Sequence, residues 1–233
     1  MPSISPNLAP LQATLAEHPE PFWISDIDST ALSVETLDHL AQQVLSEQEA
    51  EDFRHVTDAC MGGTGVGFHE SFSLRVEVLR SKGVTREQVR QVGQELVKHT
   101  DTSLQRRKDR VAIIRNRFFA VSGGVEDLIM PSLVAVGADP SHVHANKLTY
   151  DRNGVISGFE DRLTALDDGK AQQVLALELD DFAIGVGDGN NDRLIREAGG
   201  VQHFVAYVAH KQHKSVMAGA DSIAVSFAEP LLS

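Results

Sequence analysis

Short apolar runs that end in polar or glycine-rich clusters recur along the chain. The clearest lie at residues 22–25, 117–121 and 182–186, where most of four or five consecutive residues are apolar. Runs of this length, bounded by turn-forming residues, are typical of strands that are buried on both faces. The pattern therefore predicts a sheet whose strands are covered on two sides.

A different pattern fills residues 34–98. Apolar residues there recur at spacings of three and four, as in amphipathic helices. Thr85, followed three residues later by Gln88, predicts a capping box at the start of the last of these helices. Because no convincing strand appears between the first strand and residue 117, we expect residues 32–105 to form a helical cap inserted after that strand.

Beyond the insert, predicted strands and helices alternate. We expect strands near residues 142–145, Phe204 and Ile223, and a hairpin over residues 148–159 in which Asn-Gly at 153–154 supplies positive φ angles. Strands that alternate with helices predict a parallel sheet with helices on both faces. We therefore expect an α/β fold with a doubly wound parallel sheet of the Rossmann type, formed by residues 1–31 and 106–233.

Composition and charge restrict the classes of function. The 233 residues are 42% hydrophobic and 23% charged, which is enough for a substantial core. The formal charge of −12 argues against nucleic acid or an anionic membrane as the main partner, although local cations or a metal still permit an anionic small substrate. A single cysteine, Cys60, excludes a disulfide framework. Residues 1–21 lack the features of a signal peptide, so we expect a cytoplasmic protein.

Three polar clusters follow three of the predicted strands. They contain Asp26 with Asp28, Ser122 with Gly123 and Gly124, and a loop with Asp188, Asn191 and Asp192. Each cluster alone is also typical of an ordinary turn or helix cap. Because the carboxyl ends of parallel strands meet at one sheet edge, the clusters can converge. Together they offer carboxylates for a hard divalent cation and N–H and hydroxyl groups for phosphate oxygens.

These clusters, with Lys170 between the second and the third, resemble the four ordered motifs of the haloacid dehalogenase-like (HAD) hydrolases. The motifs read Asp-Ile-Asp-Ser-Thr at 26–30, Val-Ser-Gly-Gly at 121–124, Lys170, and Gly-Asp-Gly-Asn-Asn-Asp at 187–192. The helical insert is similar to the small cap of that superfamily. The first motif and the Glu-Thr-Leu-Asp that begins at Glu35 resemble the phosphoserine phosphatase family.

The resemblance implies a role for each core residue. Asp26 would be the nucleophile that forms an aspartyl-phosphate, Asp28 the general acid and base, and Lys170 the neutralising cation. Mg²⁺ would be held by Asp26, the backbone carbonyl of Asp28, Asp188 and Asp192. The substrate would be a small phosphomonoester, most plainly O-phospho-L-serine, hydrolysed to L-serine and phosphate.

The resemblance also implies substrate contacts. Ser122 and Gly123 would hold phosphoryl oxygens, and Asn191 would contact phosphate or orient its neighbours. Glu35 would bind the substrate amine and Arg75 its carboxylate. Phe68 matches a phenylalanine of the family's substrate site, and Met61 matches a residue of the cap that shields the site. Taken singly, Arg75 is also typical of a surface arginine. Phe68 and Met61 are also typical of ordinary core positions on a helix.

Two departures from the family pattern leave the substrate open. Residues 102–116 are unusually basic and lack a Pro-Gly turn, and Ala209-His210-Lys211 stands where the family carries Ala-Lys-Pro. Another small phosphorylated metabolite, or transfer of the phosphoryl group to another alcohol, therefore stays an alternative. A phosphoacceptor signalling domain is a second alternative, which the long helical insert and Asp28 disfavour.

Overall fold

The computed structural model describes residues 5–61 and 67–233, apart from the side chains of residues 58–61. Its centre is a six-stranded parallel sheet with the order β3-β2-β1-β6-β7-β8. A separate antiparallel hairpin, β4-β5, follows β3 in the chain. The strands are β1 (Phe22–Ser25), β2 (Phe118–Val125), β3 (Val143–Asn146), β4 (Leu148–Tyr150), β5 (Ile156–Phe159), β6 (Ala183–Gly187), β7 (His203–Tyr207) and β8 (Ser222–Ala224).

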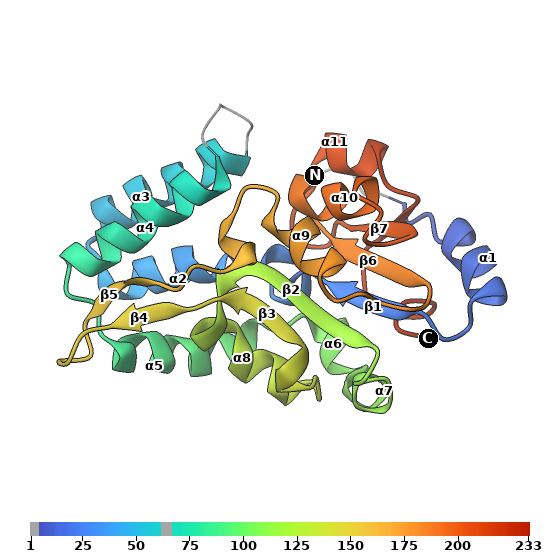
Figure 1. The fold of residues 1–233 in the computed structure, drawn as a ribbon, viewed down its shortest axis with the longest axis horizontal. Helices are drawn as coiled ribbons and strands as arrows, with labels where there is room; N and C mark the ends of the chain where they lie inside the picture. Colours follow the sequence, from blue (N-terminus) through green and yellow to red (C-terminus); the bar gives the residue numbers. More distant parts are fainter. Residues whose placement is uncertain (1–4, 62–66) are drawn as a thin grey trace.

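Helices cover both faces of the sheet (Figure 1). They are α1 (Ala9–Glu17), α2 (Thr36–Val44), α3 (Glu47–Met61), α4 (Phe68–Ser81), α5 (Arg86–Leu96), α6 (Thr102–Gln105), α7 (Lys108–Ile113), α8 (Glu126–Ala135), α9 (Gly169–Leu175), α10 (Asn190–Glu197) and α11 (Lys214–Ala218). Short helical turns are η1 (Ile27–Ala31), η2 (Val97–His99), η3 (Pro140–His142) and η4 (Leu163–Ala165). The doubly wound α/β prediction is confirmed.

The central strand β1 has a different hydrophobic core on each face. Trp23 pairs in register with Phe118 and Ile184, and all three belong to a core cluster that also contains Ile129 of α8. The next residue, Ile24, belongs to a second cluster, which packs against α9 and α10. Successive strand side chains point to opposite faces, so one short apolar run anchors both layers.

The insert shares its core with the rest of the molecule. Buried side chains of α2, α3, α4 and α5 form one cluster with residues of the β4-β5 hairpin and of α8. Helices α5 and α8 approach closely at Gly93, where a Cβ would lie 2.4 Å from the backbone oxygen of Asp127. The predicted capping box at Thr85 and Gln88 is confirmed. In Figure 1, helices α2, α3, α4 and α5 lie at the left together with the β4-β5 hairpin.

The two connections between the insert and the sheet are joined to each other. Leu32, which leaves the sheet, forms an antiparallel bridge with Thr100, which returns to it. Next to this bridge, the backbone N–H of Asp101 donates to the oxygen of Ala31 at 2.8 Å. The Asp101 carboxylate caps α6 and accepts a hydrogen bond from the Tyr207 hydroxyl at 2.8 Å. The return connection is therefore fixed to the end of β7.

Some sequence-based details were wrong. Strand β2 continues through Ser122, Gly123 and Gly124 instead of ending before them, with a register shift against β3. In the hairpin turn only Gly154 has a positive φ, of +78°, so Asn153 does not share that role.

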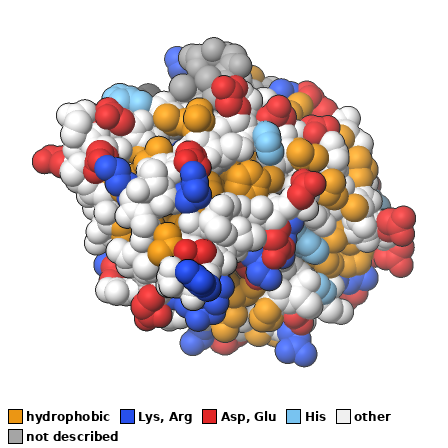
Figure 2. Space-filling model, turned by 60° about the vertical axis from the view of Figure 1, so that its left-hand side comes forward, with side chains coloured by type: hydrophobic (Ala, Val, Ile, Leu, Met, Phe, Trp, Pro, Cys, Tyr) orange, Lys and Arg blue, Asp and Glu red, His pale blue; other side chains and the backbone are white. Residues whose placement is uncertain are grey.

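Two features bear on what the surface can contact. No helix in the described part of the chain is long and apolar enough to cross a membrane. On the face in Figure 2, acidic and basic side chains are interspersed with neutral and hydrophobic ones. The net negative charge is therefore not gathered into one patch on this face.

Candidate active site

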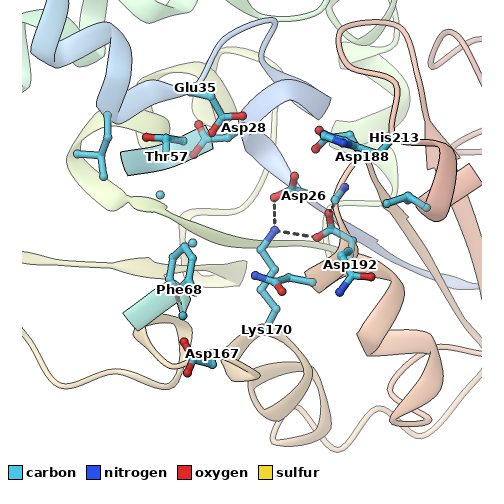
Figure 3. Close-up of a pocket in the computed structure, with 18 of the residues that line it drawn as sticks. Asp26, Asp28, Glu35, Thr57, Phe68, Asp167, Lys170, Asp188, Asp192 and His213 are labelled. Carbon is cyan, nitrogen blue, oxygen red and sulfur yellow. Dashed lines mark hydrogen bonds and ion pairs between the residues drawn. The ribbon is translucent and has the colours of Figure 1, made fainter. Parts of the chain in front are cut away.

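A cavity of about 620 Å³ opens at the carboxyl ends of β1, β2 and β6 (Figure 3). It is the point at which open parallel sheets place their ligands. Residues predicted from the sequence that line the cavity are Asp26, Asp28, Glu35, Phe68, Arg75, Gly123, Lys170, Asp188, Asn191 and Asp192. The three strand-end clusters and the insert thus converge on one space.

Lys170 holds two carboxylates of the cavity together. Its Nζ lies 2.5 Å from Oδ1 of Asp26 and 2.7 Å from Oδ1 of Asp192 (Figure 3). Burial works to lower the pKa of Lys170, but Asp192 and Asp26 outweigh it and raise that pKa. The ammonium therefore stays charged and neutralises part of a buried acidic cluster.

Asp26, Asp188 and Asp192 form the acidic cluster itself. One carboxylate oxygen from each lies within 4.8 Å of the others. Thr30 Oγ1 lies 3.3 Å from both Asp26 Oδ2 and Asp188 Oδ1. The buried Oδ2 of Asp188 has no hydrogen-bond partner among the described residues.

Burial and mutual repulsion raise the pKa values of this cluster. The pKa of Asp188 rises to about 9 through burial and the charges of Asp26 and Asp192. The pKa of Asp26 rises to about 6 through burial and Asp192, against the opposing effect of Lys170. Three oxygen ligands, one of them without a partner, fit a hard divalent cation, which would relieve this repulsion.

Asp28 has a different environment from Asp26, two residues away. Its Oδ1 accepts a hydrogen bond from the backbone N–H of Thr36 at 3.1 Å. Gly124 leaves room for it, because a Cβ there would lie 2.7 Å from Asp28 Oδ2. Burial, Glu35 and Asp26 raise the pKa of Asp28 to about 8. A carboxyl of this kind can hold a proton at neutral pH, as a general acid requires.

A strained turn connects Asp28 to Glu35. Ser29 has a φ of +56°, in the left-handed region that residues other than glycine rarely adopt. This conformation places the Ser29 hydroxyl so that it donates to Glu35 Oε1 at 2.7 Å. Backbone strain of this kind is concentrated at functional sites.

Glu35 also has a partner that the sequence did not reveal. Nζ of Lys211, in the segment after β7, lies 2.7 Å from Glu35 Oε1. Burial works to raise the pKa of Glu35, but Lys211 and Ser29 lower it below its ordinary value. The residue expected to meet a substrate amine is therefore an ionised carboxylate already paired with a lysine.

Of the residues expected to contact the phosphate, Gly123 and Asn191 line the cavity, whereas Ser122 is not among its lining residues. Ser122 is fully buried, and its Oγ accepts a hydrogen bond from the Gly124 N–H at 2.9 Å. Phe68 of the insert covers Gly123, where a Cβ would lie 2.6 Å from the end of the phenyl ring. Asn191 lines the cavity from the first turn of α10. Their contacts with a phosphoryl group stay predictions.

Arg75 reaches the cavity from α4 and is only 7% exposed. Its Nη1 lies 3.3 Å from Thr57 Oγ1, and that hydroxyl donates to Asp38 at 2.7 Å. Met61 ends α3, and its predicted shielding role falls on a side chain outside the described residues.

Several lining residues were missed from the sequence. They are Leu37, Thr57, Gly67, Asp167, His213, Ser215 and Val216. His213 and its neighbours come from the segment after β7, which differs from the family pattern, so that departure was the available signal. Asp167 had no such signal, because a lone carboxylate before a helix is typical of a cap.

Comparisons with known proteins agree with this geometry. No family model matches the chain. A phosphoserine phosphatase from Drosophila melanogaster is 27% identical over 172 residues, which cover 72% of this chain and 61% of that protein. One from Albidiferax ferrireducens is 29% identical over 187 residues, which cover 75% and 74% of the two chains. The match therefore spans less than two thirds of the Drosophila protein.

A solved structure is similar over nearly the whole fold. A phosphoserine phosphohydrolase-like protein from Francisella tularensis superposes with a TM-score of 0.78 at 20% identity. The superposition covers 90% of this chain and 97% of that one. This likeness supports the α/β fold class.

Proposed function

We propose that this chain, a member of the phosphoserine phosphatase family of haloacid dehalogenase-like hydrolases, hydrolyses small phosphomonoesters. O-phospho-L-serine is among the proposed substrates. The observation that carries this proposal is that Lys170 binds Asp26 and Asp192, which form a three-carboxylate cluster with Asp188. That arrangement supplies a nucleophile, a fixed positive charge and a cation site within one cavity.

Asp26 is the nucleophile of the proposed reaction. Its carboxylate attacks phosphorus, the bond between phosphorus and the ester oxygen breaks, and an aspartyl-phosphate forms. Lys170 favours the ionised form of Asp26, and its charge offsets that of the incoming phosphoryl group. Charge balance and positioning of this kind account for most of the catalysis in phosphoryl transfer.

Asp28 moves the protons. It donates its proton to the departing ester oxygen and then accepts one from the water that hydrolyses the aspartyl-phosphate. The raised pKa of Asp28, to about 8, supplies the protonated form needed in the first step. Its hydrogen bond from Thr36 N–H fixes Oδ1 within the cavity wall.

The cluster of Asp26, Asp188 and Asp192 would hold Mg²⁺, together with the backbone carbonyl of Asp28. The ion would neutralise phosphoryl charge in the transition state. The unpartnered Oδ2 of Asp188 and the short distances between the three carboxylates support this choice. Oxygen-only donors favour Mg²⁺ over softer metals.

A phosphate-release screen of small phosphomonoesters with Mg²⁺ tests the proposal. We expect release from O-phospho-L-serine and from p-nitrophenyl phosphate, and loss of both activities in EDTA. Persistence of a phosphorylated protein for minutes, without turnover, would instead support a phosphoacceptor domain.

A further inference from the structure

Lys211 and Glu35 form an ion pair at the wall of the cavity. Their side chains are 31% and 17% exposed, and Nζ lies 2.7 Å from Oε1. The two residues are 176 positions apart and come from the segment after β7 and from the turn before α2. Ser29 donates to the same Oε1, so one oxygen of Glu35 already accepts two hydrogen bonds.

The neighbouring arginine is arranged differently. Arg75 reaches the buried Asp38 only through the neutral Thr57 hydroxyl, which lies 3.3 Å from Arg75 Nη1. Among the described residues, no carboxylate lies within 4 Å of the Arg75 guanidinium, whereas Glu35 has Lys211 at direct contact. The cavity wall therefore keeps a guanidinium for an anion, while the carboxylate of Glu35 is already compensated by Lys211.

This arrangement weakens the attraction for a substrate ammonium. Lys211 Nζ lies 2.7 Å from Oε1, so a cation that approaches the second oxygen of Glu35 also comes close to this ammonium. The repulsion between the two positive charges offsets part of the attraction to the carboxylate. Displacing Lys211 instead would break a partly buried ion pair and leave a second charge to be solvated. Neither route gives an α-amino group much net binding energy.

We propose that Lys211 is a specificity-determining residue that satisfies Glu35 in place of a substrate ammonium. The site then takes phosphorylated hydroxycarboxylates whether or not they carry an α-amino group. The proposal rests on the proposed phosphatase function and widens its substrate class from amino acids to hydroxy acids in general.

The test compares two substrates that differ only in the amino group. O-phospho-L-serine and 3-phosphonooxypropanoate are assayed with Mg²⁺, each for kcat and KM. In the unmodified protein we expect their kcat/KM values to agree within about threefold, because a group that gains little net binding energy changes the rate little. In Lys211→Met we expect the ratio to shift by about tenfold or more toward phosphoserine, mainly through its KM.

Two further variants separate specificity from folding. Lys211→Arg retains the charge and should keep the original substrate ratio. Lys214→Met removes an exposed lysine three residues away, in the first turn of α11, and should leave the ratio unchanged. Circular dichroism of all three variants checks their folding.

Each outcome bears on a separate claim. A strong preference of the unmodified protein for phosphoserine would overturn the inference, and so would an unchanged ratio of the two kcat/KM values in Lys211→Met. In either case, hydrolysis of p-nitrophenyl phosphate would still support the proposed phosphatase activity. An unmodified protein that releases phosphate from none of the three compounds would overturn the proposed function, and the inference with it.

Discussion

The ammonium of Lys170 lies 2.5 Å from Oδ1 of Asp26, although 144 positions separate the two residues in the chain. The parallel sheet makes this contact possible, because Asp26 directly follows β1 and because α9, which carries Lys170, leads into the neighbouring strand β6. The lysine also binds Asp192, so one cation fixes the residue after β1 relative to the first turn of α10.

Asp26→Asn tests the nucleophile. An amide cannot attack phosphorus as a carboxylate does, so we expect kcat to fall by more than about a thousandfold, as expected when a nucleophile is removed. Phosphate release with p-nitrophenyl phosphate measures the loss. Asp168→Asn is the matched control, since that carboxylate is exposed and bonds only Gln172 among the described residues. Full activity in Asp26→Asn would exclude the proposed nucleophile.

Mg²⁺ should stabilise the folded protein. A ligand present at about 100 times its Kd adds about 2.7 kcal/mol, which for a chain of this size raises Tm by about 5 to 11 °C. Asp188→Asn should remove most of that increase, because it takes away the carboxylate whose Oδ2 has no partner within residues 5–61 and 67–233. Thermal melts with Mg²⁺ and with EDTA measure the difference, and an equal increase in both proteins would contradict the assigned cation site.

Without metal, stability should fall as the pH rises. The pKa values of Asp26, Asp28 and Asp188 in the folded protein are about 6, 8 and 9, above the ordinary carboxyl value of about 4. The folded state therefore binds more protons than the unfolded state between about pH 4 and pH 9, and these groups lose their contribution as the pH rises through that interval.

The same variant tests this pH dependence. Asp188→Asn cannot ionise at that position, so in EDTA its Tm should decline less between pH 5 and pH 8.5 than that of the unmodified protein. Added Mg²⁺ should reverse the order at pH 8.5. Parallel declines in EDTA would show that Asp188 does not contribute.

Gly123→Ala tests the packing of the insert on the phosphate side of the site. The new Cβ would lie 2.6 Å from the end of the Phe68 ring, so the ring must move. We expect lower kcat/KM and a cost of about 1–3 kcal/mol in unfolding free energy, as for other overpacked sites. Adding Phe68→Leu should recover part of both losses, and a double variant no better than Gly123→Ala would contradict the contact.

Arg75→Ala tests recognition of the substrate carboxylate. Loss of a charged hydrogen-bond donor should raise KM for phosphoserine on the order of 10- to 100-fold. KM for p-nitrophenyl phosphate, which has no carboxylate, should change far less. Arg80→Ala on the same helix is the control, because that arginine is exposed and pairs with Glu77. Equal effects on the two substrates would remove the assigned role.

Local patterns were enough to predict the parts of the fold that depend on neighbouring residues. The apolar runs marked the central strands, and Thr85 with Gln88 marked the start of α5 because a capping box involves only four residues. The extension of β2 through Ser122 could not be predicted in this way. Its glycines have the composition of a turn, and only pairing with β3 extends them into a strand.

Some residues of the site could be predicted from local sequence patterns and others could not. Asp26 and Asp188 were predictable because parallel strands bring their ends together whatever the loops do. The Lys211–Glu35 pair was not, since it depends on the path of the segment after β7 and on the left-handed turn at Ser29. Neither conformation leaves a periodic signal in the sequence.

The bridge between Leu32 and Thr100 bears on how this architecture can diversify. Because the segment between them leaves and re-enters the sheet at adjacent points, its length adds little closure entropy to the fold of the sheet. Segments of other sizes can therefore be accommodated at the same junction while Asp26, Lys170 and Asp188 keep their places. The chemistry and the choice of substrate can then change independently of each other.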